Sequence, residues 1–490
     1  MNRRHFIAAA TAGLLAMTAM AAEKKPYNVL MISVDDLNDW TGFMKQYPSA
    51  RTPNIDQLAK EGIYFSNAQA AAPLCNPCRT AVLTGLRPDQ TGIYGNTYNY
   101  TLVLKDRLTL PRYFRNNGFY VCGAGKLFHG DYCDNQDWDE YLLRDRDEIP
   151  SGGKNKKQKI GKAAWAKLDV DDAAMDDTKM VNYAIDKLNE KHDRPFFIHC
   201  GTYKPHLPWD VPKKYFDLHP LSSVVLPDVP EDDLDDIPPA GLAMIEHSGS
   251  TVADLKAAGK WKEAVQAYLA AHSFADAQVG RLLDALKASP SADNTIVVLW
   301  GDHGWHLGEK EHWTKNTLWE RATHAPLIFK VPGFTQPGQR IITPVDFMNI
   351  YPTLADLCGL EIPAHCEGVS MKPLLADPDL TWKRPAVTTC GEGNHAMRDS
   401  RWRYICYKDG SEELYDHEND PNEWKNLADV PELGEVKARL AQWIPTGVPQ
   451  LNIKNYKKMA HANPRRRGVI VTPDDAVGKP ATKYYPNKTK

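Results

Sequence analysis

Acidic side chains follow two of the apolar segments of the chain. Asp35 and Asp36 come directly after a segment that predicts a strand over 28–34, and Asp302 and His303 come directly after another. Carboxylate oxygens are hard ligands, so three of them together suit calcium or magnesium better than zinc. One acidic pair can also cap a helix or form a surface turn, and a lone histidine is more often structural. The second acidic position, after a separate strand, favours a metal site.

Cationic side chains follow two further apolar segments. Lys126 and His129 lie after the second predicted strand, and Lys204 and His206 lie after the third. The carboxyl ends of strands in an open parallel sheet line one crevice, so we expect these groups to meet the acidic cluster. Each of them alone is more typical of a solvated loop. Together they indicate a site that binds an anion.

Cys75 lies in the most specific segment of the chain, PLCNPCRTAVLTGLRP. Pro77 and the residues after it predict a helix whose first turn lies immediately after Cys75. A nucleophile at this position has free backbone N–H groups and a positive dipole end beside it, which favour an anionic oxygen or a sulfate. Cys75 and Cys78 could instead form a redox pair or half of a zinc site. No second CxxC pair or HxxxH spacing completes such a zinc site.

The elements that position these residues alternate along the chain. Apolar runs predict strands over 28–34, 120–122, 196–199, 295–300 and 327–331. Helical patterns begin at Thr52-Pro53 and cover 265–289, where Pro290 follows. This alternation predicts an α/β fold with a mostly parallel sheet that helices cover on both faces.

The character of the sequence changes near Pro373. The aromatic-rich segments RWRYICY and EELYDHE, joined by KDGS, predict an antiparallel hairpin. We therefore expect a main domain over 23–372 and a smaller C-terminal α+β domain with an antiparallel sheet over 373–490. The last forty or so residues form a basic tail, and another basic stretch begins at Gly152 as an exposed insertion.

The length and composition set further limits. The chain of 490 residues exceeds one compact core, and its formal net charge of -3 is typical of an ordinary soluble protein rather than a nucleic-acid binder. Residues 1–22 have a basic start, a short apolar stretch and a small-residue site, which predict a signal peptide and a periplasmic or secreted protein. No later segment predicts a membrane helix. The cysteines number nine, too few for a disulfide scaffold, although Cys358 and Cys366 could pair.

The segment from Cys75 to Arg79, followed by TAVLTG, resembles the CxPxR signature at which sulfatases convert cysteine to formylglycine. The motifs DDL, TPNIDQLA, GKxFH, KPHLP, DHGWxLGE and THAPLIF occur in the family order and span nearly the whole main domain. They most resemble the iduronate-2-sulfatase-like branch, which also has histidine at the position of His303. Cys78 departs from the common signature, which has serine there. The resemblance implies an alkaline-phosphatase-like fold.

The resemblance also implies roles for individual residues. One calcium ion per chain would be bound by Asp35, Asp36, Asp302, His303 and the formylglycine made from Cys75. Arg79 and Lys126 would hold the formylglycine hydroxyls, and His129 would hydrogen-bond to them. Lys204, His206 and Lys315 would contact the sulfate or the bridging oxygen. In the family mechanism a hydroxyl of the hydrated aldehyde attacks sulfur, a group such as His206 protonates the departing sugar oxygen, and a base such as His129 then helps to release sulfate.

The expected function is the removal of sulfate from an acidic carbohydrate, with a formylglycine-generating maturase as a further partner. The first alternative is a phosphodiester or phosphonate monoester hydrolase of the same superfamily. The second is a non-catalytic protein that binds a polyanion through its basic insertion and tail. We expect no nucleic-acid partner and no stable membrane insertion.

Overall fold

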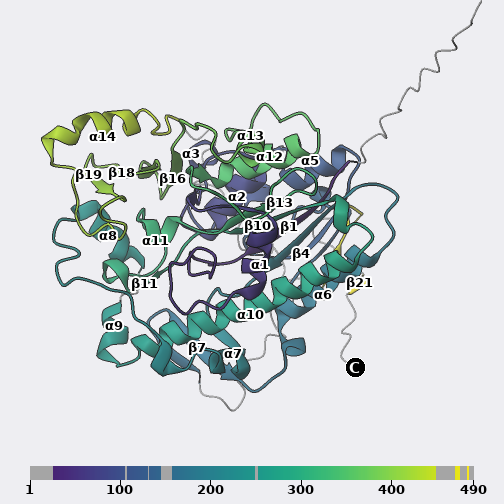
Figure 1. Cartoon of the computed structure of the whole chain (residues 1–490), viewed down its shortest axis with the longest axis horizontal. Coiled ribbons are helices and arrows are strands. Elements are labelled where there is room, and N and C mark those ends of the chain that lie inside the picture. The colour runs from purple at the N-terminus through teal and green to yellow at the C-terminus, as the bar shows by residue number, and fades with distance from the viewer. Residues whose placement is uncertain are drawn as a thin grey trace, which may run out of the picture.

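The central sheet of the molecule contains strands whose side chains are all buried. The computed structural model describes residues 26–104, 107–130, 132–144, 157–248, 252–447, 469–474 and 483–484. The sheet has ten strands (Figure 1). In sheet order they are β14 (Gln339–Ile341), β2 (Ile63–Phe65), β13 (Leu327–Lys330), β10 (Thr295–Gly301), β1 (Asn28–Val34), β8 (Phe196–Thr202), β4 (Tyr120–Gly125), β5 (Glu140–Leu142), β20 (Val469–Val471) and β21 (Lys483–Tyr484).

The middle of this sheet is parallel. Strands β10, β1, β8, β4 and β5 all run in one direction, so their carboxyl ends lie at one edge. The strand predicted over 327–331 is present as β13, but it runs antiparallel to β10. The amino end of β13 therefore lies at the edge where the other predicted strands end. The α/β class with a mostly parallel sheet is otherwise confirmed.

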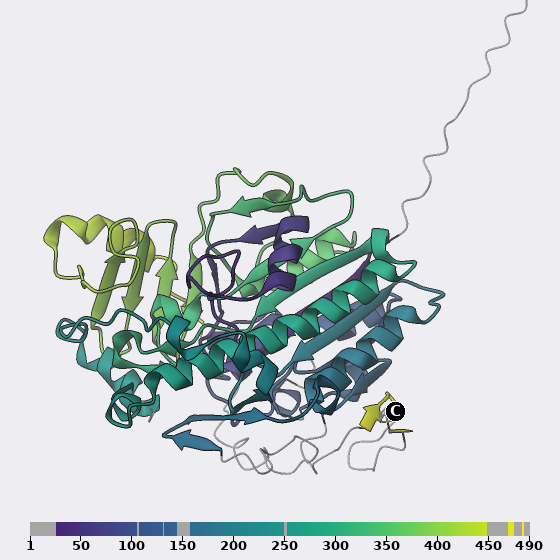
Figure 2. The ribbon, with the colours of Figure 1, turned by 60° about the horizontal axis from the view of Figure 1, so that its bottom comes forward.

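Side chains of β1 alternate between two apolar clusters. Val29 and Met31 pack on one face, and Leu30 and Ile32 pack on the other. The first face is covered by α2 (Cys75–Thr84), α5 (Leu110–Asn116) and α12 (Ile350–Leu357). The second is covered by α1 (Pro53–Glu61), α6 (Asp176–Asn189) and the long α10 (Trp261–Ala288), which crosses the sheet in Figure 2. The helices predicted from Thr52-Pro53 and over 265–289 are thus present, as α1 and α10.

The smaller sheet near the C-terminus is antiparallel throughout. Its strands are β16 (Ala386–Thr389), β17 (His395–Arg398), β18 (Trp402–Cys406) and β19 (Glu412–Asp416). β18 and β19 form the predicted hairpin, whereas β16 and β17 were not predicted. Helix α14 (Gly434–Ala441) packs on one face, and α8 (Pro239–Ser248) packs on the other. This sheet lies beside the main domain at the left of Figure 1.

Shorter elements complete the described fold. A three-stranded sheet contains β6 (Gln158–Ile160), β7 (Ala163–Leu168) and β9 (Trp209–Pro212); two-stranded pairs are β3 (Ala68–Gln69) with β15 (Val345–Asp346) and β11 (His306–Leu307) with β12 (Trp313–Thr314). The remaining α-helices are α3 (Pro88–Thr91), α4 (Tyr100–Val103), α7 (Lys213–Asp217), α9 (Val252–Ala257), α11 (Glu320–Thr323) and α13 (Lys372–Ala376).

Two expectations from the sequence concern cysteines and membranes. Cys358 and Cys366 are both free thiols, so they do not form a disulfide. Within the described ranges, no helix has both the length and the apolarity required to cross a bilayer. The predicted signal peptide lies outside the described residues, as do most of the basic tail and the first part of the basic insertion.

Candidate active site

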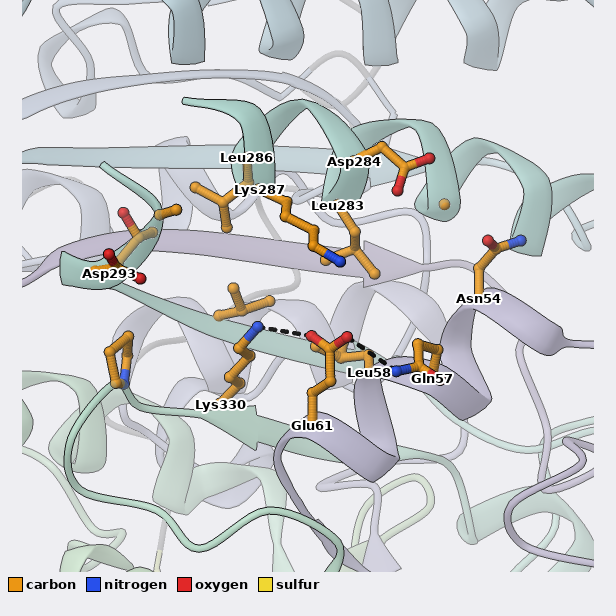
Figure 3. Close-up of a pocket in the computed structure, with 15 residues that line it drawn as sticks. Asn54, Gln57, Leu58, Glu61, Leu283, Asp284, Leu286, Lys287, Asp293 and Lys330 are labelled. Atoms are coloured by element: carbon orange, nitrogen blue, oxygen red, sulfur yellow. Dashed lines mark hydrogen bonds and ion pairs between the residues drawn. The ribbon is translucent and has the colours of Figure 1, made fainter. Parts of the chain in front are cut away.

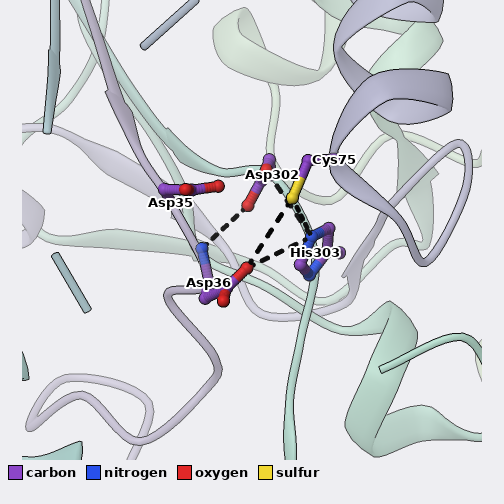
Figure 4. A group of neighbouring side chains, drawn as sticks. All are labelled: Asp35, Asp36, Cys75, Asp302 and His303. Atoms are coloured by element: carbon purple, nitrogen blue, oxygen red, sulfur yellow. Dashed lines mark hydrogen bonds and ion pairs between the residues drawn. The ribbon is translucent and has the colours of Figure 1, made fainter. Parts of the chain in front are cut away.

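The predicted acidic cluster lies at the carboxyl edge of the parallel strands. Val34 of β1 pairs with Gly301 of β10, so the residues that follow them emerge side by side. The amino end of α2 brings Cys75 to the same place. One ligand atom from each of five buried residues lies within 4.8 Å of the others: Asp35, Asp36, Cys75, Asp302 and His303 (Figure 4). We call this set the five-residue cluster.

Backbone geometry fixes the position of Asp36. Its φ of 60° is in the left-handed region, which is uncommon for a residue with a side chain. In this conformation its amide donates to Asp302 Oδ1 at 2.9 Å. Strained backbone at such a place is typical of functional sites. The turn after β1 is thus tied to the turn after β10.

The imidazole of His303 presents an unprotonated nitrogen to the cluster. Its Nδ1 lies 2.9 Å from the carbonyl oxygen of Gly304, which can only accept, so Nδ1 carries the proton in the neutral ring. Its Nε2 lies 3.3 Å from Cys75 Sγ and 3.4 Å from Asp36 Oδ1. Burial, the largest cause, lowers the pKa of His303 and favours this neutral form. The ring is therefore prepared to act as a ligand.

Three buried cations surround the carboxylates. The guanidinium of Arg79 donates from Nε to Asp302 at 2.9 Å and from Nη2 to Asp35 at 3.3 Å. Lys126 donates to the other oxygen of Asp35, and Lys315 donates to Asp36. The Nζ of Lys315 also lies 3.1 Å from Cys75 Sγ. Positive charge therefore surrounds the thiol as well as the carboxylates.

These ion pairs affect the carboxylates unequally. Burial opposes ionisation of Asp35, yet the charges of Lys126, His206 and Arg79 hold its pKa well below the usual value. For Asp36 burial prevails over the charge of Lys315, and its pKa is raised. The buried Oδ2 of Asp36 has no hydrogen-bond partner among the described residues. An acceptor that is buried and unsatisfied is unusual, and it is consistent with a ligand atom for a cation.

The donor set fits a hard divalent cation. Three carboxylates and one neutral imidazole nitrogen converge within the five-residue cluster, and an oxygen of Asp36 remains unused. Oxygen-rich sets of this kind suit calcium or magnesium, whereas zinc prefers more nitrogen and sulfur. The residues present therefore fit the predicted metal.

The other predicted site residues lie around this cluster. His206 is partly exposed, and its Nε2 lies 3.9 Å from Asp36 Oδ2. His129 is half-buried, and its buried Nδ1 has no hydrogen-bond partner among the described residues. Desolvation, followed by the charge of Lys126, holds its pKa well below 6.5. Lys204 donates instead to the carbonyl of Pro208, and among the described contacts none joins its ammonium to the five-residue cluster. Burial lowers the pKa of Lys204 to about 8.

Sequence reasoning missed a buried polar chain beneath the cluster. The hydroxyl of Ser33 donates to the carbonyl of Lys126 at 2.7 Å and lies 2.9 Å from His199 Nε2. Tyr141 donates to the carbonyl of Gly125 at 2.9 Å. These bonds hold the end of β4, which carries Lys126. A serine and a histidine inside otherwise apolar strands were the available clue.

A separate cavity of about 450 Å³ lies at the opposite edge of the sheet, near Thr295 at the amino end of β10. Figure 3 shows it between α1 and α10, and Glu61 and Lys330, on the side of α1, form an ion pair of 2.7 Å. None of the predicted site residues lines this cavity. It therefore plays no part in the chemistry considered below.

Known proteins resemble the chain over most of its length. The family described as "Sulfatase" matches residues 27–360, and the one described as "N-sulphoglucosamine sulphohydrolase, C-terminal" matches residues 308–447. A curated protein of Formosa agariphila named "Sulfatase" is 40% identical, with 87% of this chain and 89% of the relative covered. The human protein named "Iduronate 2-sulfatase" is 31% identical, with coverages of 77% and 74%.

A solved structure shows the same fold. The phosphonate monoester hydrolase of Agrobacterium radiobacter superposes with a TM-score of 0.71 at 21% identity. The alignment covers 85% of this chain and 94% of that protein. At this identity the likeness concerns the fold and leaves the reaction to be argued from the site.

Proposed function

The chain belongs to the sulfatase family, and from this premise we propose that it removes sulfate from an acidic glycan by means of a formylglycine made from Cys75 and a bound calcium ion. The alkaline-phosphatase-like fold predicted from the sequence is confirmed. The observation that carries the proposal is the position of Cys75, between His303 and Lys315 and beside three buried carboxylates. The name of the human relative supports a uronate-containing substrate.

Calcium would be held by Asp35, Asp36, Asp302, His303 and the modified side chain at position 75. When bound, the ion supplies positive charge that stabilises the anion at the reacting centre. The Oδ2 of Asp36 and the Nε2 of His303 are the acceptors that the protein leaves available for it. Lys315 donates to Asp36, lies 3.1 Å from Cys75 Sγ and would contact the substrate from this position.

Cationic residues would offset the negative charge of the sulfate ester, which is the main obstacle to the reaction. A sulfate monoester keeps a negative charge that repels nucleophiles, so fixed positive groups lower the barrier by stabilising the transferring group. Arg79 and Lys126 would hold the hydroxyls of the hydrated aldehyde at position 75. Lys315 lies 3.1 Å from Cys75 Sγ and would contact the sulfate.

Two histidines are placed for proton transfer. The Nδ1 of His206 donates to the carbonyl of Leu207 at 2.6 Å, so Nε2 carries a proton only in the imidazolium form. We assign this form the protonation of the departing sugar oxygen; burial lowers the pKa of His206, and the charge of Asp35 opposes that effect. His129 is held neutral by burial and can accept a proton, so we assign it the role of base in sulfate release. Lys204 would turn from the carbonyl of Pro208 to contact the sulfate.

The proposal also covers the export, the maturation and the domain organisation of the protein. Residues 1–22 would direct export to the periplasm or the medium. A formylglycine-generating maturase would act on Cys75 within a motif that has cysteine at position 78. Residues 23–372 would form the catalytic domain, and residues 373–490 the smaller domain.

Mass spectrometry of the peptide across Cys75 tests the proposal when it is combined with sulfate release from a panel of sulfated oligosaccharides. The protein is produced in a host with a formylglycine-generating system. Formylglycine at position 75 together with sulfate release is the expected result. Formylglycine with hydrolysis only of phosphonate or phosphodiester substrates would favour the superfamily alternative instead.

A further inference from the structure

The hairpin of β6 and β7 contributes no residue to the active site described above, but the hairpin lies beside that site. Its turn contains Gly161, with a φ of 56°, and Lys162, whose side chain is exposed. The hairpin carries further lysines at positions 157, 159 and 167. It belongs to the small sheet in which β7 pairs with β9, and β7 lies beneath α10 in Figure 1.

The register of this sheet places the turn close to a proposed catalytic residue. Trp165 of β7 is aligned with Trp209 of β9 in a parallel pair. Three residues before each of them come Lys162 and His206. The two residues therefore lie at the same end of the small sheet, and His206 reaches within 3.9 Å of Asp36.

A shared aromatic cluster holds the hairpin against the segment that carries Lys315. Ile160 and Trp165 of the hairpin pack with Trp209 and Trp313 in one apolar cluster. The rings of Trp209 and Trp313 lie 5.8 Å apart, and β12, which contains Trp313, ends one residue before Lys315. The hairpin therefore packs against β9, which follows His206, and against β12, which precedes Lys315.

Electrostatic effects agree with this placement. The pKa of Lys162 is lowered, first by partial burial and then by the charge of Lys315. At the other strand, Lys157 pairs with Asp210 at 3.2 Å, and its charge contributes to the lowered pKa of Lys204. The lysines of the hairpin therefore extend the positive field of the site outward.

We propose that this hairpin, chiefly through Lys162, forms a subsite for a second anionic group of the substrate, one sugar substituent away from the sulfate that is removed. The inference rests on the proposed function, because it takes the sulfate to occupy the space between Lys315 and His206. The ligand class is a glycan with at least two anions near each other. A carboxylate and a second sulfate ester have the same chemistry here.

Calorimetric binding to a Cys75→Ala background tests the subsite without hydrolysis. Three probes are compared: a disaccharide with a uronate carboxylate and one sulfate, the same disaccharide with the carboxyl group reduced to a hydroxymethyl group, and this reduced form with a second sulfate. Adding Lys162→Gln should raise the dissociation constant of one or both of the two-anion probes about fivefold, which is the size expected when one exposed ion pair is lost. The reduced probe with one sulfate should bind as before.

Lys167→Gln is the matched control, because it removes a lysine from the same hairpin near Phe216, where its ammonium lies 5.3 Å from the ring. It should change no affinity, and Lys162→Arg should restore two-anion binding. Equal weakening of all three probes by Lys162→Gln, no weakening, or no binding at all would overturn the subsite. Selective weakening without sulfate release by the converted wild type would instead refute the proposed function and leave the subsite standing.

Discussion

The Nζ of Lys315 lies 3.1 Å from the Sγ of Cys75, and the same ammonium donates to Asp36. It also lies 5.1 Å above the ring of Trp305, which limits its movement. Burial opposes its charge, but Asp36 and the neighbouring acidic groups raise its pKa above the ordinary value. Lys315 is therefore a permanent cation beside the position of the nucleophile.

Replacing Lys315 should lower the rate of sulfate release in a protein that remains folded. We expect Lys315→Met to lower kcat/KM for sulfate release at least 100-fold, because a fixed charge at the transferring group is lost. Steady-state kinetics on an aryl sulfate measures the effect. Lys330→Met is the control, since Lys330 pairs with Glu61 at the opposite edge of the sheet. Wild-type kcat/KM in Lys315→Met would contradict the role given to this residue.

Calcium removal should destabilise the wild type but not a variant that lacks a ligand. A ligand at about 100 times its Kd stabilises the folded state by about 2.7 kcal/mol. Chelation should therefore lower the thermal midpoint, and added calcium should restore it. In Asp36→Asn neither treatment should matter, and elemental analysis should find one calcium per wild-type chain and none in the variant. A wild-type midpoint that is indifferent to chelation would argue against the metal site.

The sequence predicts the acidic half of the site well because its residues terminate fully buried strands. All seven residues of β1 and of β10 are buried, so the polar residues that follow them stand out at the sheet edge. Lys315 gives no such pattern. It follows β12, a strand of only two residues, and was identified through family resemblance alone.

Two features of the strands could not be predicted from the sequence, for physical reasons. An apolar strand such as β13 carries no mark of its direction, so its antiparallel course depends on the connection to β10. Strand β17 was missed because His395 and Arg398 interrupt its apolar pattern. Both are buried in the structure, where His395 lies near Asp89 and Arg398 near Glu320. Partners distant in sequence make this strand possible.

An ion-pair network that joins the small antiparallel sheet to α11 should contribute strongly to stability. Arg403 is fully buried; its Nε lies 2.6 Å from Glu423, and its Nη2 donates to Glu320. Arg403→Met would leave these two carboxylates without their main partner, and we expect a loss of about 3–5 kcal/mol in the free energy of unfolding. Urea titration measures it. Arg401→Met removes a partly exposed pair with Asp416 and should cost far less, because solvent screens such a pair. Similar losses of unfolding free energy in both variants would show that the buried network stabilises the protein no more than an exposed ion pair does.

His219 should make the protein less stable in acid. The hydroxyl of Ser273 donates to the carbonyl of Arg51, so it accepts from Nε2 of His219, at 2.9 Å, in the neutral ring. Burial lowers the pKa of His219 to about 4, against about 6.5 in the unfolded chain. Between these values the unfolded state binds the additional proton, so stability falls as the pH falls, by about 1.4 kcal/mol per pH unit.

His219→Gln keeps a donor for Ser273 but cannot titrate. Between pH 7.5 and pH 5.0 the variant should therefore lose about 2 kcal/mol less unfolding free energy than the wild type, as measured by urea titration. The comparison is a difference between two proteins, so pH effects common to both, including any on metal binding, cancel. Ser273→Ala is the control: it removes the hydrogen bond but retains the titrating ring, so its loss between the two pH values should remain at least as large as that of the wild type. Equal losses in His219→Gln and the wild type would mean that His219 binds its proton equally well in the folded and unfolded chains.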